Sequence, residues 1–320
     1  CSSSNGKSYR GNYQKTNIIN MAKKSTRSLI EIFGYSPTDT SPLARKFWDL
    51  SACPFIGKAC IKYNHDNTIC YGTCSVSNTG HDVIICPNRL YANKYSSIQR
   101  VGNEVFGNIP FFLFDEYITY STQSRMETLN CIVALGLNSG KEVKLSKMSM
   151  DWVLAHIEDG ELRGYVGIEV QSIDITGNYR DAWYAARNKE AFIPASAHGL
   201  NWANVHKRLI PQIIRKSLVY SRSKLVTHGL YFIVPEAVYQ KFEEIIGSDI
   251  PKTDQDANDV ITVHTYDLGI SVPSGQQREL IQKRTLKFKL DDFATRFITG
   301  SNLPSGEVLD KKIREILHCR

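Results

Sequence analysis

Apolar and polar positions alternate most regularly between residues 148 and 173. Met148–Ile157 and Gly164–Ile173 each have the alternation and composition of a β-strand. Asp159 and Gly160, which lie between them, are typical of a tight turn. Because such a turn joins neighbouring strands, the pattern predicts an antiparallel pair.

The same alternation places polar side chains inside these apolar strands. Three apolar residues share one face of the second strand, namely Val166, Ile168 and Val170. Glu169 and Gln171 then lie on the opposite face, and Asp151 on the first strand is able to point to the same side. An acid within an apolar strand is costly unless it is paired or binds a cation. The alternative is that both acids reach solvent at a strand edge.

A long helix is predicted over Asn201–Lys224, with Asn201 as its cap and a kink at Pro211. Its core-facing positions, at helical spacing, are Trp202, Val205, Leu209, Ile213 and Leu218. Its six basic residues, with no acid among them, are Lys207, Arg208, Arg215, Lys216, Arg222 and Lys224. This imbalance favours a surface that faces phosphates over an ordinary solvated face.

Further periodic segments predict a mixed α/β scaffold around these elements. The expected elements are a helix over Pro235–Ile246 ended by Gly247, strands over Val260–Tyr266 and Leu286–Leu290, and a closing helix over Glu307–Leu317. No run of eighteen apolar residues occurs, so the sequence predicts no membrane-spanning helix and no membrane partner.

Composition adds charge and cysteine to this picture. The 320 residues carry 39 Lys and Arg against 32 Asp and Glu, a net charge of +7 that is compatible with nucleic acid as a partner. We expect residues 1–20 to be a non-native or disordered leader, because Met21 opens an ordinary cytoplasmic start. The alternative interpretation is that Cys1 is the mature end of a lipoprotein.

Five of the eight cysteines are Cys53, Cys60, Cys70, Cys74 and Cys86. In a reducing cytoplasm such a cluster more often binds metal than forms disulfides. Four of the thiols stand beside turn formers or at the end of a strand, whereas Cys70 has no comparable turn. We therefore expect Cys53, Cys60, Cys74 and Cys86 to hold a structural iron or zinc, with buried free cysteines as the alternative.

The arrangement of Asp151 before Glu169-Val170-Gln171 resembles the active site of PD-(D/E)XK nucleases in the E-x-Q variant, in which glutamine occupies the place of the usual lysine. Further segments between residues 45 and 245 resemble the NotI-type restriction endonucleases. These segments are Cys53-Pro-Phe, Gly72–Val76, Ile85–Arg89, Asp151-Trp152, Glu169–Asp174 followed by Gly177–Tyr179, Leu200–Arg208 and Gly229–Pro235.

This resemblance implies a type II restriction endonuclease that cuts a palindromic site in double-stranded DNA as a homodimer. It implies an α/β core of the PD-(D/E)XK class over residues 101–320 and a small four-cysteine metal domain, with iron as the expected metal, over residues 21–100. A cognate DNA methyltransferase is a possible partner in such a system. The alternatives are a non-catalytic, metal-containing DNA-binding protein and a repair or structure-specific nuclease on the same fold.

The resemblance also gives roles to individual residues. Asp151 and Glu169 are expected to bind Mg²⁺, with the Val170 carbonyl as a further ligand, and Gln171 to orient the attacking water. Glu142 is either an additional carboxylate or a surface charge pair with Lys144. The expected DNA-binding residues are Asn201, Asn204, Lys207, Arg208, Gln212, Arg215 and Lys216.

Overall fold

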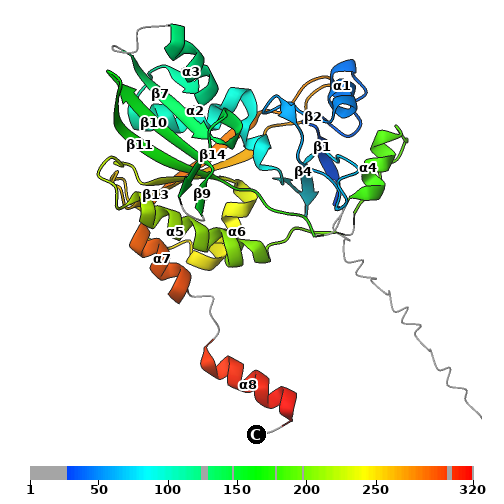
Figure 1. Cartoon of the computed structure of the whole chain (residues 1–320). Helices are drawn as coiled ribbons and strands as arrows, with labels where there is room; N and C mark the ends of the chain where they lie inside the picture. Colours follow the sequence, from blue (N-terminus) through cyan, green and yellow to red (C-terminus); the bar gives the residue numbers. More distant parts are fainter. Residues whose placement is uncertain are drawn as a thin grey trace, which may run out of the picture.

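A computed structural model describes residues 27–123, 129–145, 148–176, 179–196, 198–300 and 305–318. The expectations for residues 1–20, including Cys1, lie outside the described residues, as do Cys319 and the Gly177-Asn178 pair. The architecture is mixed α/β, as the sequence predicts, with helices on both faces of one large sheet (Figure 1).

The large sheet has seven strands. Their bounds are β6 Phe111–Leu113, β7 Asn130–Gly136, β10 Trp152–Glu158, β11 Glu161–Val170, β12 Leu230–Pro235, β13 Val260–Leu268 and β14 Leu280–Lys289. The spatial order is β14-β13-β12-β11-β10-β7-β6. Strands β11, β12 and β13 run parallel to one another, and β10 and β14 run antiparallel to their neighbours, so the sheet is mixed.

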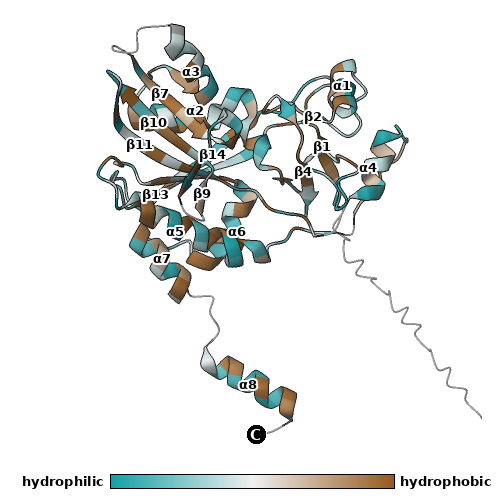
Figure 2. Ribbon diagram, viewed as in Figure 1, coloured by the Kyte–Doolittle hydropathy of each residue, from teal (hydrophilic) through white to brown (hydrophobic). Residues whose placement is uncertain are grey.

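Helices cover the two faces of this sheet with different parts of the chain. Their bounds are α2 Ala92–Phe106, α3 Phe114–Gln123, α5 Ile210–Tyr220, α6 Glu236–Ile246 and α7 Leu290–Thr299. Ile98 and Val101 of α2 pack on one face, and α5, α6 and α7 pack on the other. The apolar strands between these layers form the core (Figure 2). Alternate residues of each strand therefore enter different layers.

The predicted hairpin is confirmed. Strands β10 and β11 are antiparallel, with Glu158 opposite Glu161, and Asp159 and Gly160 both have positive φ (53° and 75°). Two consecutive residues in the left-handed region form the type of two-residue turn that matches the twist of a hairpin. The register then shifts by one residue between Ile157, which pairs with Leu162, and His156, which pairs with Gly164, and this shift sets the pairs at the far end of the hairpin.

The first predicted strand is interrupted at Asp151, which is a correction to the sequence expectation. Residues Met148–Met150 form β9 and pair with β8 (Val143–Leu145), whereas β10 begins at Trp152. Asp151 occupies the bend between them, where its carboxylate accepts a hydrogen bond from the Val170 backbone at 3.0 Å. The bend leaves the side chain of Asp151 at the end of the sheet.

The predicted helix over residues 201–224 is shorter and is not capped by Asn201. It consists of a π-helical turn, Val205–Leu209, followed by α5. Pro211 lies in the first turn of α5. A prolyl nitrogen has no hydrogen to donate to the preceding turn, and the wider π-turn accommodates this loss.

The core-facing positions in the second half of α5 differ from the prediction. Leu218 lies five residues after Ile213, roughly 140° away around the helix, whereas Lys216 and Tyr220 lie three and seven residues after Ile213 and share its side. Ile213 is buried as predicted, but Leu218 is exposed, which corrects the predicted apolar stripe. Lys216 and Tyr220 are buried instead.

A second, smaller sheet lies beside the large one (Figure 1). Its strands are β1 Leu29–Ile32, β4 Thr73–Asn78 and β5 His81–Ile84, and the short strands β2 Ala52–Cys53 and β3 Lys58–Ala59 pair next to it. Helices α1 (Pro42–Leu50) and α4 (Arg180–Arg187) meet at Trp48 and Trp183, whose ring centroids are 5.5 Å apart. Helix α4, which follows β10 and β11 in the sequence, thus packs against the part of the chain that contains the small sheet.

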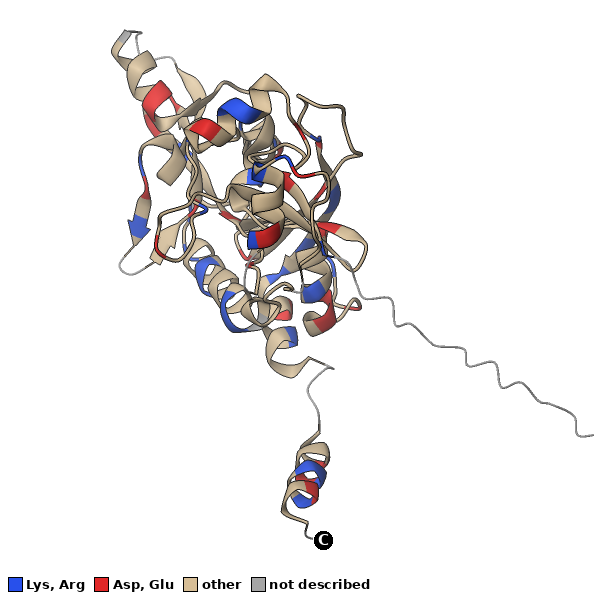
Figure 3. Ribbon diagram, turned by 90° about the vertical axis from the view of Figure 1, so that its right-hand side faces the viewer, with Lys and Arg blue, Asp and Glu red and all other residues tan. Residues whose placement is uncertain are grey.

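Helix α8, Gly306–Leu317, has no buried residue and carries both signs of charge beside the chain end in Figure 3. It therefore does not close the fold as the sequence predicts. Across the described ranges, no helix is long and apolar enough to cross a membrane.

Candidate active site

The register of hairpin β10–β11 brings three of the predicted catalytic residues together. Trp152 lies opposite Ile168, so Asp151 lies beside Glu169 at the end of the pair. The backbone nitrogen of Asp151 is 3.4 Å from Glu169 Oε1, and the Gln171 amide donates to Asp151 Oδ2 at 3.5 Å. Gln171 is held in turn because its backbone donates to the Ile233 carbonyl at 3.0 Å.

Glu169 is a buried carboxyl group, with 3% of its surface exposed. Burial and, next, the neighbouring Asp151 raise the pKa of Glu169 to about 8, and these effects outweigh the opposing effect of Lys216. Lys216 Nζ donates a hydrogen bond to Glu169 Oε2 at 2.5 Å. An acid that is neutral until slightly basic pH becomes a strong ligand for a cation once its proton is displaced.

Close packing of helix α5 on β11 positions Lys216. At Gly167 an added Cβ would lie 2.1 Å from the Tyr220 ring, so only glycine lets this helix approach the strand. The buried Tyr220 hydroxyl has no hydrogen-bond partner among the described residues. Lys216 lies one helical turn before Tyr220 and is thereby directed at Glu169.

Asp151 and Gln171, together with Lys216, open onto a cavity of about 630 Å³, whereas Glu169 lies buried behind them. Its lining residues are Leu145, Met148, Ser149, Asp151, Gln171, Gln212, Arg215 and Lys216. Carboxylate oxygens therefore lie on one wall, while the opposite wall carries an amide and two cations. A polar cavity with both charges fits a charged ligand better than an apolar one.

Glu142 immediately precedes β8, where Val143 pairs with Met150, and it is not among the residues that line the cavity. It forms an ion pair with Lys144 at 2.9 Å and accepts a short hydrogen bond from the Ser149 hydroxyl. These two contacts lower the pKa of the half-buried Glu142 carboxyl, the Ser149 bond having the larger effect. The charge pair that was one of the two interpretations of Glu142 is thus present.

The expected DNA-binding residues have different surroundings. Gln212 and Arg215 are exposed and line the cavity, and a second cavity of about 310 Å³ adds Asn204 and Arg208. The two cavities share Gln171 and Gln212, so they are adjacent.

Of the remaining residues of this set, Asn201 and Lys207 line neither cavity, and Lys216 lines the first one from a buried position. Lys207 is exposed, Asn201 is half-buried and bonded through its backbone to the Asp174 carbonyl, and Lys216 is buried. Lys216 therefore departs from the exposed, phosphate-facing position that the sequence suggests for it.

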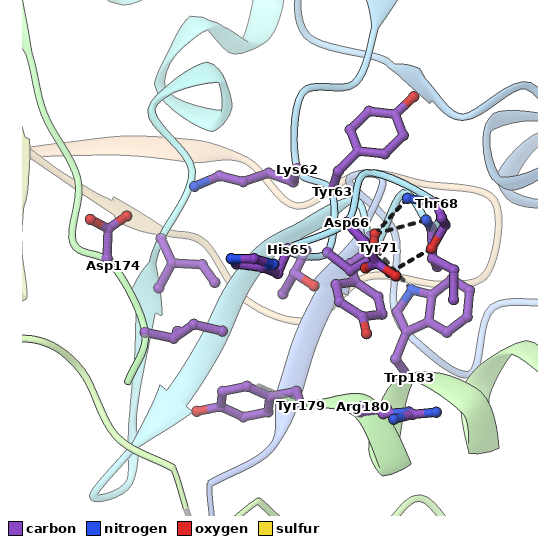
Figure 4. Close-up of a pocket in the computed structure, with 15 residues that line it drawn as sticks. Lys62, Tyr63, His65, Asp66, Thr68, Tyr71, Asp174, Tyr179, Arg180 and Trp183 are labelled. Atoms are coloured by element: carbon purple, nitrogen blue, oxygen red, sulfur yellow. Dashed lines mark hydrogen bonds between the residues drawn. The ribbon is translucent and has the colours of Figure 1, made fainter. Parts of the chain in front are cut away.

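A third cavity of about 720 Å³ lies next to the second one, on the side of the small sheet (Figure 4). It shares Lys62 and Asp174 with the second cavity. Its walls carry aromatic side chains, namely Tyr63, Tyr71, Tyr179 and Trp183. Neighbouring cavities thus share lining residues from Asp151 to Tyr71, which follows Cys70, and we call the three cavities together the groove.

The five clustered cysteines are all buried and free. Cys74 and Cys86 are held side by side, because the backbone nitrogen of Cys86 donates to the Cys74 carbonyl at 3.2 Å. The pKa of Cys53 is raised to about 11, chiefly by burial, with smaller contributions from Cys86 and Cys60. Burial likewise raises the pKa of the Cys74 thiol, with contributions from Cys86, Cys53 and Cys60. The four expected ligands are thus electrostatic neighbours.

Cys70 competes for a position in this cluster. Its hydrogen bond with the Cys60 thiol is the largest cause of a lowered pKa at Cys70 and of a raised pKa at Cys60. Within the part of the chain that is described, no group of three or more His, Cys, Asp or Glu side chains is arranged to hold one metal ion. The donors are of the right kind and near one another, but their positions do not form a closed site.

One buried pair beneath this cluster was not anticipated. Arg89 and Glu31 are 0% and 1% exposed, and Arg89 donates to both Glu31 oxygens at 2.9 to 3.2 Å. Ser75 donates to the same carboxylate at 2.9 Å. The sequence feature that could have indicated this pair is Glu31 itself, a single acid in the apolar run Leu29–Ile32. A buried acid needs a partner.

Comparison with known proteins adds no family to this geometry: no protein-family model and no curated protein matches the chain. A proposal of function therefore rests on the site itself and on the sequence resemblance described above.

Proposed function

We propose that this protein is a type II restriction endonuclease, which hydrolyses phosphodiester bonds of double-stranded DNA at a specific palindromic sequence in the presence of Mg²⁺. The observation that carries the proposal is the meeting of Asp151, Glu169 and Gln171 at one end of the β10–β11 hairpin. Asp151 and Gln171 open onto the groove, whose lining also bears cations and amides. Such a groove suits a phosphate backbone next to a metal site.

Asp151 and Glu169 fit Mg²⁺ by the chemistry of their donors. Two adjacent carboxylates supply hard oxygen ligands, and Mg²⁺ commonly takes one or two of these together with waters and phosphate oxygens. The Val170 carbonyl is a further candidate ligand. Bound Mg²⁺ would polarise the phosphate that is cut and lower the pKa of a bound water.

The side chain of Gln171 then positions the reacting groups. Gln171 carries no exchangeable charge at neutral pH, so its amide acts by hydrogen bonding to the attacking water or to the phosphate. The water oxygen forms a bond to phosphorus while the bond from phosphorus to the leaving oxygen breaks. The water proton passes to solvent, and the leaving oxygen takes up a proton.

The exposed face of the π-turn and α5 would hold the DNA backbone. Arg208 and Arg215 are exposed cations along the groove, and Asn204 and Gln212 add amide groups that reach phosphates or base edges. Asn201 and Lys207 belong to the same proposed surface by their position in the sequence.

The proposal includes a structural iron or zinc held by Cys53, Cys60, Cys74 and Cys86 within an amino-terminal domain. Support comes from four buried thiols that influence one another's ionisation. The present placement is not a closed site, so the thiols must draw together when a metal binds. Thiolates are soft ligands that suit either metal.

The larger assembly follows from the proposed substrate. A palindromic site has two-fold symmetry, and a homodimer presents two equivalent catalytic sites to it. We place this enzyme in the cytoplasm, where the DNA lies, together with a DNA methyltransferase that protects the same sequence. The core over residues 101–320 would be of the PD-(D/E)XK class.

Incubation of the purified protein with plasmid DNA and MgCl₂ tests this function. We expect discrete fragments, none in EDTA, and none from Asp151→Ala protein that still binds DNA. Binding without cutting by the wild-type protein would favour a non-catalytic DNA-binding role. Cutting of branched DNA but not of linear duplex would favour a structure-specific nuclease.

Metal analysis of the purified protein tests the cysteine site separately. We expect about one iron or zinc per chain, since four thiolates complete one tetrahedral site. Less than about half an equivalent would contradict that part of the proposal and leave the proposed nuclease activity unaffected.

A further inference from the structure

Lys216 differs from every other basic residue of the expected DNA-binding set. Lys207, Arg208 and Arg215 are exposed, whereas Lys216 is 7% exposed and lies inside the site. Its Nζ atom is 2.5 Å from Glu169 Oε2, which is the proposed metal ligand on β11. A lysine that only neutralises the DNA backbone needs no such burial, because its long side chain can keep the charge in water.

The pair that Lys216 forms is a poor device for stability. Burying two charges costs more than their attraction usually returns, and apolar residues of similar size often serve stability better. The pair is also open on one side, because Lys216 lines the same cavity as Asp151 and Gln171. Such a costly group at the edge of a polar cavity indicates a role in the site.

The geometry of the ammonium group leaves it able to bind a ligand. An ammonium group has three hydrogens, and within the described residues one of them is given to Glu169. The cavity provides the space toward which the others can be directed. The neighbouring Gln171, by contrast, brings no positive charge to the end of β11.

We propose that Lys216 is the active-site cation: Glu169 holds its ammonium group at the proposed metal site, where it donates a hydrogen bond to a non-bridging oxygen of the phosphate that is cut. The charge that Gln171 does not supply from the strand is thus supplied from helix α5. This inference rests on the proposed nuclease function. It assigns Lys216 to the bond-breaking step and not to general DNA binding.

The test is the rate of a single turnover of preformed enzyme–plasmid complex, started with MgCl₂. For Lys216→Gln we expect a rate about 100-fold lower, the size typical for loss of one charge-stabilising donor, with DNA affinity within about threefold of wild type. For Lys216→Arg, which retains a cation, we expect a rate within about tenfold of wild type. Misfolded protein lowers the amplitude of this reaction and not its rate.

Lys241→Met is the matched control, because Lys241 pairs with Glu244 at the same 2.5 Å but on the surface of α6. We expect its rate and affinity to be unchanged. A Lys216→Gln rate within about threefold of wild type would overturn the inference, given the effect expected from a lost donor. A DNA affinity that falls as far as the rate would overturn it too. A wild-type protein that cuts no DNA would instead refute the proposed function.

Discussion

Two acid–base pairs are buried among the described residues, and they differ in how many contacts hold them. In the first, which we call the closed pair, the Arg89 guanidinium binds both Glu31 oxygens and donates to the Arg278 carbonyl at 2.7 Å, although Glu31 also lines a cavity of about 410 Å³. In the second, which we call the open pair, Lys216 meets Glu169 through one contact and lines the cavity of about 630 Å³ beside Asp151 and Gln171. Several contacts fix the segments that carry the closed pair, whereas Lys216 retains hydrogens for a ligand next to the proposed catalytic residues.

The largest expected effect is on the DNA-cutting activity, and it concerns the open pair, Glu169 and Lys216. Glu169→Gln removes a proposed metal ligand, so we expect plasmid cutting to fall at least about 1,000-fold while DNA binding persists. Its unfolding temperature should fall less than that of Arg89→Met, because Lys216 lines a cavity in which water can hydrate the unpaired ammonium group. Cutting at the wild-type rate by Glu169→Gln would show that this pair is not part of a catalytic site.

The closed pair should respond in stability. Arg89→Met leaves Glu31 buried without its cation, and breaking a buried pair in this way costs about 3–5 kcal/mol. Urea unfolding measures this loss as a lower midpoint at an unchanged slope. The cutting rate of the protein that remains folded should be unaffected. A variant as stable as wild type would mean that Glu31 and Arg89 do not anchor the small sheet.

The raised pKa of Glu169 predicts a pH-dependent metal requirement. Its pKa is about 8 without metal, so below pH 8 Mg²⁺ must displace a proton before it binds the carboxylate. The Mg²⁺ concentration for half-maximal cutting should therefore rise as pH falls, by about tenfold per pH unit for one displaced proton. Titrations at pH 6.5, 7.5 and 8.5 measure it. A requirement that does not change over this range would contradict the description of Glu169.

The smallest expected effect tests how α5 is positioned. Gly167→Ala adds a methyl group against Tyr220, and overpacking of this kind costs about 1–3 kcal/mol. Thermal unfolding measures it, and the displaced helix should also slow cutting. Tyr220→Phe is the matched control, since the Tyr220 hydroxyl has no partner to lose among the described residues. Equal stability of the alanine variant and wild type would show that the contact is loose.

The hairpin shows which part of the site the sequence can predict. Asp159 and Gly160 specify a two-residue turn, and the turn makes β10 and β11 antiparallel neighbours. The register that places Asp151 beside Glu169 also needs the one-residue shift between His156 and Ile157, because the turn alone would place Asp151 opposite Ile168. The pairing of the two strands was therefore predictable from a short stretch of consecutive residues, whereas the shift that sets the final register was not.

The partner of Glu169 was not predictable in the same way. Lys216 lies three residues after Ile213 and so on the buried side of α5, but the charge of a lysine led us to expect an exposed position. Glu31 and Arg89 are likewise 58 residues apart, and no periodic pattern connects them. Five cysteines come together through irregular turns, so their composition predicts a cluster but not its geometry.

The most direct test of the central claim is to sequence the DNA ends produced by the purified protein from a mixed linear duplex library in MgCl₂, alongside the Asp151→Ala variant. The account predicts that all wild-type ends share one palindromic sequence and that the variant produces none. Intact DNA with the wild-type protein, or ends without a common sequence, would contradict it.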